Sequence, residues 1–116
     1  MKGDHLGEFE ELVLLAVRRL EGDAYGVTVQ RLLERETSRS VSLGAAYAAL
    51  DRLHAKGLLV SSTTPGTPIR GGRSRRLFRL TAEGRRTIER LRRLRDRLYG
   101  AAPSSSAAMR PKANRT

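Results

Sequence analysis

The sequence predicts a mainly α-helical fold with one small β-hairpin, in which three helices precede two strands and a last helix follows them. Apolar residues recur at helical spacing in four segments, and two short segments of strand composition flank a loop rich in Gly and Pro. Charge supplies a third observation, because residues 70–98 hold 12 arginines and three acidic residues in a chain of net charge +11. This concentration indicates a polyanionic partner, nucleic acid or an anionic membrane surface, with a solvated arginine-rich face as the simpler alternative.

The first helix is expected from about Glu8 to Leu20. Its apolar residues follow the i, i+3, i+4, i+7 pattern: Phe9, Leu12, Val13, Ala16, Val17 and Leu20. Leu14 and Leu15 make the stripe wider than one domain face requires. We therefore expect this helix to make a second contact, with another subunit or with a ligand.

The second and third helices are expected to be joined by a short turn over residues 37–41. The second should run from about Ala24 to Glu36 with Asp23 as N-cap, and the third from an N-cap at Ser42 to about Lys56. One side of the third helix should carry Leu43, Tyr47, Leu50 and Leu53. The opposite side should be small and flat, with Ala45, Ala48, Ala49, Arg52 and Ala55.

Two strands, Leu58–Thr64 and Arg75–Leu80, are expected to form a hairpin. Its tip should be basic, with Arg70, Arg73, Arg75 and Arg76. The last helix should begin after Thr81 as N-cap and reach Tyr99. Its apolar seam is narrow and is surrounded by arginine: Ile88, Leu91, Leu94 and Leu98. A thin seam on a long helix favours contact with another chain.

This order of elements is the winged helix-turn-helix plan, ααα-ββ-α, with a C-terminal dimerisation helix. We expect residues 1–80 to form the DNA-binding domain, residues 81–99 the dimerisation helix and residues 100–116 a disordered basic tail. The third helix would enter the major groove, where its small face allows close approach to the bases. The basic hairpin would be the wing, which contacts phosphates or the adjacent minor groove.

Several motifs, taken in order, resemble the PadR family of transcriptional regulators. They are Ala24-Tyr25-Gly26-Val27, then Tyr47 with Leu50 and Leu53, then Lys56-Gly57-Leu58-Leu59, then the Gly/Arg-rich segment 70–76, and then Phe78-Arg79-Leu80-Thr81-Ala82-Glu83-Gly84. The resemblance covers about residues 6–98. It implies a homodimeric repressor whose first and last helices form the dimer interface. It also implies that any small-molecule effector binds near that interface, although the last helix carries only Tyr99 as an aromatic residue.

Two sets of site residues follow from the pattern and the resemblance together. The predicted DNA-binding residues are Ser42, Ala45, Tyr47, Ala48, Arg52, Arg70, Arg73, Arg75 and Arg76. The predicted dimer-interface residues are Phe9, Leu12, Leu15, Ile88, Leu91, Leu94 and Leu98. Two alternatives stay open: Tyr47 is either a phosphate contact or a core aromatic, and Arg52 either contacts DNA or pairs with Asp51 or Glu36.

Other classes of function find little support in the residues. The chain has no Cys, and His5 and His54 lack metal-ligand spacing, so no metal or cofactor is expected. No catalytic constellation can be placed, so no enzyme is expected. No apolar run is long enough to span a membrane, which indicates a cytoplasmic protein. A ligand-responsive regulator and a basic RNA-binding protein remain as alternatives to a repressor that binds double-stranded DNA.

Overall fold

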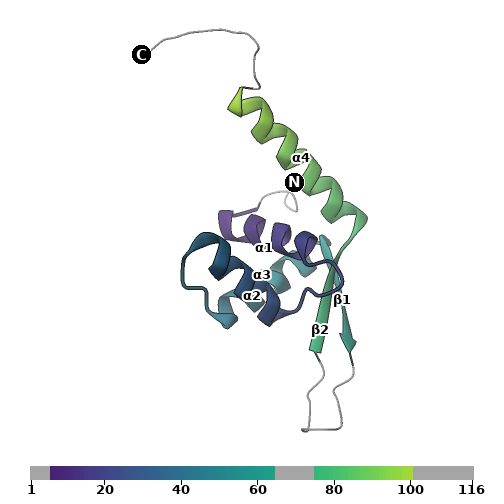
Figure 1. Ribbon diagram of the computed structural model, residues 1–116. Coiled ribbons are helices and arrows are strands. Elements are labelled where there is room, and N and C mark those ends of the chain that lie inside the picture. Colours follow the sequence, from purple (N-terminus) through teal and green to yellow (C-terminus); the bar gives the residue numbers. More distant parts are fainter. Residues whose placement is uncertain (1–5, 65–74, 101–116) are drawn as a thin grey trace.

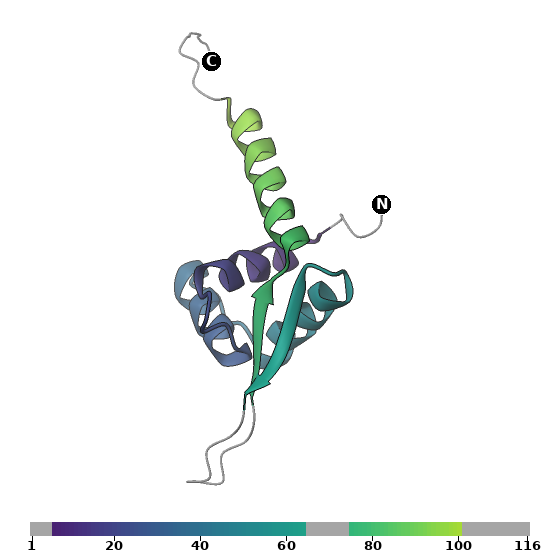
Figure 2. The same ribbon diagram turned by 90° about the vertical axis from the view of Figure 1, so that its right-hand side faces the viewer.

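The computed structural model describes residues 6–64 and 75–100. In chain order the elements are α1 (Glu8–Arg19), α2 (Gly26–Thr37), α3 (Leu43–Ala55), β1 (Leu59–Thr64), β2 (Arg75–Leu80) and α4 (Ala82–Tyr99). The first three helices form one body, the hairpin lies against it, and α4 projects from it (Figure 1). Figure 2 shows α4 leaving at one end of the body while the Thr64 and Arg75 ends of the strands point the other way. The predicted fold class is confirmed.

The core lies where α1, α2 and α3 meet the hairpin. Leu14 of α1, Leu50 of α3 and Phe78 of β2 are completely buried within it. Ile88 extends the same cluster to the first turns of α4. Each such side chain contributes about 1.5–3 kcal/mol on burial, so the core fixes how the hairpin and α3 lie relative to each other.

The hairpin is antiparallel, with a register that pairs Leu59 with Leu80 and Thr64 with Arg75. Its strand β2 is also tied to the helical body, because the backbone N–H of Phe78 donates to the carbonyl of Ala24 at 2.9 Å. Ala24 precedes α2, so one hydrogen bond joins the wing to the start of the helix-turn-helix.

The helix starts confirm two predicted caps and correct a third. The Ser42 hydroxyl accepts from the backbone N–H of Ala45 at 3.0 Å, and the Thr81 hydroxyl accepts from that of Gly84 at 2.9 Å. The prediction that α2 begins near Ala24 with Asp23 as its N-cap was wrong, since the cap is Tyr25. The Thr28 hydroxyl accepts from the backbone N–H of Tyr25 at 2.8 Å and donates to the Asp23 carbonyl at 2.6 Å.

One residue of α3 lies on the opposite side from the one predicted, and another is more exposed than predicted. Ala49 is completely buried, and Leu43 is 38% exposed. The inner face is Ala46, Ala49, Leu50 and Leu53, which recur at helical spacing. Leu43 lies in the first turn at the outer end of this face, and Ala49 is small enough for close packing against the neighbouring elements.

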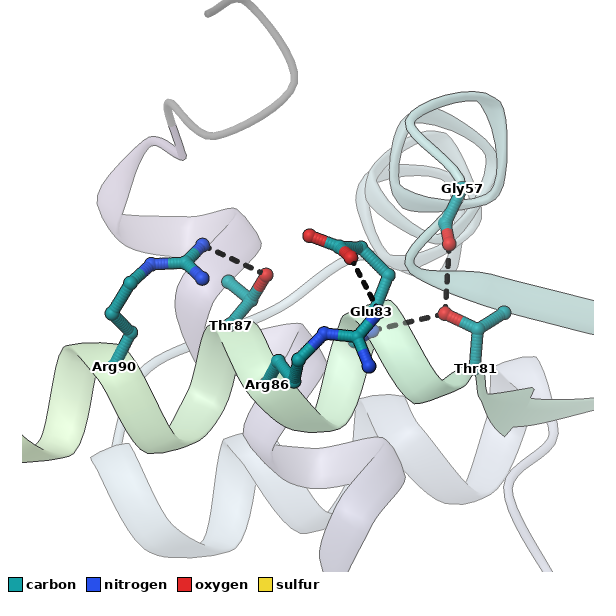
Figure 3. A network of polar contacts seen from close by, with 7 residues as sticks. Gly57, Thr81, Glu83, Arg86, Thr87 and Arg90 are labelled. Atoms are coloured by element: carbon teal, nitrogen blue, oxygen red, sulfur yellow. Dashed lines mark hydrogen bonds and ion pairs between the residues drawn. The ribbon is translucent and has the colours of Figure 1, made fainter.

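The base of α4 is fixed by a close approach between backbones. A Cβ atom at Gly84 would overlap the carbonyl oxygen of Leu58, so glycine is required there. The Thr81 hydroxyl also donates to the carbonyl of Gly57 at 2.7 Å (Figure 3). Beyond this anchor α4 has few neighbours in the chain, and its residues from Leu94 onward are exposed.

Candidate nucleic-acid interface

The turn that leads into α3 is held by two side chains from α2. The Gln30 side-chain amide donates to the backbone carbonyl of Val41 at 2.8 Å, and the Glu34 carboxylate accepts from the Val41 N–H at 3.0 Å. Ser38, at the end of α2, takes the left-handed conformation that reverses the chain. The sequence analysis did not predict these two contacts; the available signal was a pair of polar residues, Gln30 and Glu34, one turn apart on α2.

The exposed face of α3 begins at its cap and consists mostly of small residues. The predicted site residues Ser42, Ala45 and Ala48 are all exposed. Exposure is a requirement for contact with DNA. Gly44 lies beside these residues, and a Cβ atom added there would meet nothing within 4 Å, so the space beside this position is open. A helix of this kind can bring its backbone close to base edges in the major groove.

Tyr47 lies between the core and the surface. It is half-buried and packs against the core cluster, and its ring occupies the space that a Cβ at Gly26 would need. The glycine of α2 and the tyrosine of α3 therefore set the distance between the two helices of the helix-turn-helix. This contact explains why an aromatic ring lies there.

Arg52 forms an ion pair that the sequence did not indicate. Its guanidinium donates to Glu10 of α1 at 2.6 Å, and the Lys56 ammonium donates to the other oxygen of the same carboxylate at 2.7 Å. The expected alternatives, Asp51 and Glu36, pair with other arginines. The error arose because α1 and α3 cross at a point that periodicity along the chain does not reveal.

Glu10 is one of two buried polar or charged residues among those described, and its environment favours the ionised form. Burial by itself would raise the pKa of the Glu10 carboxyl. The hydrogen bonds from Lys56 and Arg52 outweigh burial, and the net result is a pKa below the ordinary value. The carboxylate thus ties the C-terminal half of α3 to α1.

The arginines at the base of the wing lie against the body of the protein. The Arg75 guanidinium lies over the Tyr25 ring, 4.0 Å from its centroid. The Arg76 guanidinium lies 4.7 Å from the Phe78 ring centroid and donates to Asp51 of α3 at 2.9 Å. Both residues are therefore part of strand β2 and not of a hairpin tip. Arg70 and Arg73 lie outside the described residues.

The predicted dimer-interface residues fall into two groups. Phe9 and Leu12 are half-buried against the core, and Ile88 is part of it. The others face outward to different extents: Leu15 is 41% exposed, Leu91 is half-buried, Leu94 is 42% exposed and Leu98 is 77% exposed. The exposed group forms an apolar strip along α4 that continues onto α1.

A groove separates α1 from α4 next to this strip. Its volume is about 260 Å³, and its apolar lining comes from Leu14, Leu15, Ile88 and Leu91. Its rim is charged, and there Arg95 of α4 makes a bidentate pair with Glu11 of α1 at 2.6 and 2.9 Å. The groove thus has an apolar floor and lies between two helices that are joined by an ion pair.

Residues 6–64 and 75–100 contain no cluster of three or more His, Cys, Asp or Glu that could hold a metal ion. Within the same ranges no helix is both long enough and apolar enough to cross a membrane.

A helix-turn-helix with a small-faced second helix, followed by a two-stranded wing, defines a winged-helix DNA-binding protein. The model of the transcriptional regulator PadR-like family matches residues 13–90. The chain therefore belongs to the PadR-like family, whose members are transcription factors and not enzymes, and it is a DNA-binding transcriptional regulator. The resemblance deduced from the sequence motifs is confirmed.

Solved structures agree with this assignment. A PadR family transcription regulator from Clostridium difficile R20291 is 28% identical, with a TM-score of 0.60 over 80% of this chain and 91% of that one. A PadR family regulator from Eggerthella lenta DSM 2243 is 26% identical, with a TM-score of 0.63 over 79% and 80%. RosR of H. salinarum is 25% identical, with a TM-score of 0.65 over 85% and 82%. A comparison with curated proteins finds no match.

Proposed function

We propose that the protein is a homodimeric repressor that occludes a promoter in the cytoplasm. The observation that carries this proposal is the placement of α4. The helix projects from the body with Leu94 and Leu98 exposed, while the strands extend from the opposite end (Figures 1 and 2). A second copy that covers this strip would leave both wings and both α3 helices free for DNA. In this division residues 1–80 bind DNA, residues 81–99 dimerise, and residues 100–116 form a basic tail.

The proposed DNA contacts follow the geometry of α3 and the wing. Ser42, Ala45 and Ala48 would face base edges and the adjacent backbone, and Tyr47 would offer its hydroxyl to a phosphate. Arg70 and Arg73 would contact phosphates from the wing, as would Arg75 and Arg76 at its base. Arg52 would add a phosphate contact from α3 while Glu10 holds one edge of its guanidinium. Two α3 helices related by a dyad would read half-sites about 34 Å apart.

A second candidate function is ligand-responsive regulation, which the groove between α1 and α4 favours. Its volume of about 260 Å³ and its leucine lining suit a small apolar molecule. Its rim carries both signs of charge, with Glu11, Glu89 and Asp96 beside Arg18, Arg92 and Arg95, so an apolar molecule with a small polar group is the ligand chemistry that fits best. A bound molecule there would contact both helices of the proposed interface and could change the angle between the two DNA-binding bodies.

Fluorescence anisotropy tests the proposed function. Purified protein is titrated onto the DNA upstream of its own coding region and onto scrambled DNA, over a salt series. We expect a preference of at least about 1,000-fold for the native fragment, with cooperative binding of two chains. Equal and steeply salt-dependent binding to both fragments would contradict sequence-specific repression at this site. Tighter binding to duplex RNA than to DNA at equal salt would instead support the RNA-binding alternative.

A further inference from the structure

One strip of the exposed face of α3 carries a single charged side chain. Gly44, Ala48, Asp51 and Ala55 recur at intervals of four, three and four residues, and all four are exposed. Three of them have no side-chain hydrogen-bonding group. The Asp51 side chain, 57% exposed, is thus the one group on this strip that can distinguish donors from acceptors on a base edge.

Asp51 also joins the two elements that are proposed to meet DNA. Its Oδ1 atom accepts from the Arg76 guanidinium of β2 at 2.9 Å, and that guanidinium lies over the ring of Phe78. Phe78 is completely buried, so its ring is a fixed support. The guanidinium is therefore held between a fixed ring and a carboxylate.

The fold does not depend on this ion pair. Both partners are more than a third exposed, and pairs of this kind contribute little to stability. Arginine binds carboxylate and phosphate with the same planar fork of donors, so a DNA phosphate can replace Asp51 as the partner of Arg76. As long as Asp51 holds Arg76, this exchange has an electrostatic cost on every DNA sequence.

The carboxylate acts differently on bases and on phosphates. It repels phosphates regardless of sequence, whereas in the major groove it accepts hydrogen bonds only from the amino groups of cytosine and adenine. The carboxylate therefore weakens binding to every DNA sequence and strengthens binding only to sequences that offer an amino group at the right position. This combination increases the difference in affinity between cognate and non-cognate DNA.

We propose that Asp51 is a specificity-determining residue, which restrains Arg76 and weakens binding to non-cognate DNA more than binding to the operator. The proposal rests on the proposed function, in which α3 lies in the major groove. It predicts that removal of a negative charge from the DNA-facing surface makes the regulator bind more tightly and less selectively.

The test compares wild-type protein with Asp51→Ala and Asp51→Asn on two duplexes. One duplex is selected by the wild-type protein from a random library, and the other is its scrambled sequence. For Asp51→Ala we expect tighter binding to the scrambled duplex and a steeper salt slope, which is the change in the logarithm of the binding constant with the logarithm of the salt concentration. The slope should be steeper by about 0.9 for each subunit that gains a phosphate contact. The ratio of the two affinities should fall about fivefold or more, and Asp51→Asn should lie between the other two proteins.

Two further variants identify the residue responsible. Adding Arg76→Ala to Asp51→Ala should remove the gain in slope, because the released guanidinium is then absent. Glu83→Gln is the matched control: it breaks the 2.9 Å pair with Arg86 at the base of α4 (Figure 3), away from the DNA-facing surface. It should leave the affinity ratio unchanged.

Three results would overturn the proposal. They are an unchanged salt slope in Asp51→Ala, a steeper slope with an unchanged affinity ratio, and a gain in slope that persists in the double variant. If the wild-type protein enriches no sequence from the library, the proposed function fails instead, and the salt slope measured on an unselected duplex of the same length still decides whether Asp51 restrains Arg76.

Discussion

The exposed faces of α3 and α4 differ in charge, in apolar character and in the size of their side chains. The exposed strip of α3 is built from Gly44, Ala48 and Ala55 around one acidic residue. By contrast, α4 carries seven arginines and exposes Leu94, Leu98 and Tyr99. The face proposed to read DNA is therefore the one with little charge.

The arginines of α4 are largely occupied within the chain. At least four of the seven form ion pairs with carboxylates, at Glu11, Glu21, Glu83 and Glu89. Two of these carboxylates belong to α1 and to the segment that follows it, so the pairs also orient α4 on the body. Net charge thus indicates that the partner is a polyanion, while the small exposed face of α3 indicates which surface of the protein contacts the bases. Four variants test this comparison.

The largest effect is expected from the apolar strip of α4. Leu91→Asp combined with Leu94→Asp places two carboxylates in the proposed interface and should give monomers. Loss of the second DNA-binding body should weaken operator binding by at least about 100-fold. Sedimentation equilibrium checks the mass, and Val60→Asp, at an exposed apolar position on β1, is the control that should stay dimeric. A dimer in the double variant would show that the strip is not the interface.

The next largest effect is expected at the base of α4. In Gly84→Ala the new methyl group meets the backbone carbonyl of Leu58, which cannot move without disturbing the start of β1. We expect a loss of about 1–3 kcal/mol in the free energy of unfolding, measured by urea denaturation. Wild-type stability in this variant would mean that α4 sits farther from β1 than the structure shows.

Glu10→Gln should have a smaller effect that depends on pH. The variant removes the negative charge that accepts hydrogen bonds from both Arg52 and Lys56, so it should lose about 1–3 kcal/mol at neutral pH. The folded-state pKa of Glu10 is lowered, so its stabilisation is present above the ordinary value of 4.5 and disappears as the pH falls through the lower folded value. Thermal melting between pH 7 and pH 3 should therefore show the two proteins converging at acid pH. A constant difference across this range would contradict the role assigned to the Glu10 charge.

The smallest change in stability is expected at Gly44. The position lies inside α3 with open space around it, so Gly44→Ala should stabilise the fold by about 0.5–1 kcal/mol. The added methyl group would nevertheless stand between the helix and the bases, and operator affinity should fall. Chemical denaturation and anisotropy measured on the same protein separate the two effects. An operator affinity equal to that of the wild type would place the bases elsewhere on the surface.

Much of the fold could be predicted because it depends on local signals. Helical periodicity placed α1, the caps Ser42 and Thr81 placed α3 and α4, and the bounds of β2 were predicted without error. The start of α2 was missed because the Thr28 hydroxyl bonds back to Tyr25 and Asp23, a local choice that the sequence does not distinguish from capping by Asp23.

The site was harder to predict because its contacts join distant segments. Arg52 with Glu10 and Arg76 with Asp51 are 42 and 25 residues apart, and only the packing of α1, α3 and β2 brings them together. Ala49 was misplaced for a similar reason, since a small residue suits a tight core contact as well as a flat exposed face. Sequence could identify the type of each residue but not its partner.

The symmetry of the DNA sequence that the full-length protein selects from a random duplex library tests the central claim most directly. The account predicts an inverted repeat whose half-sites are about 34 Å apart, bound by two chains, because two α3 helices related by a dyad must read it. Enrichment of a single unrepeated site bound by one chain, or of no sequence at all, would contradict it.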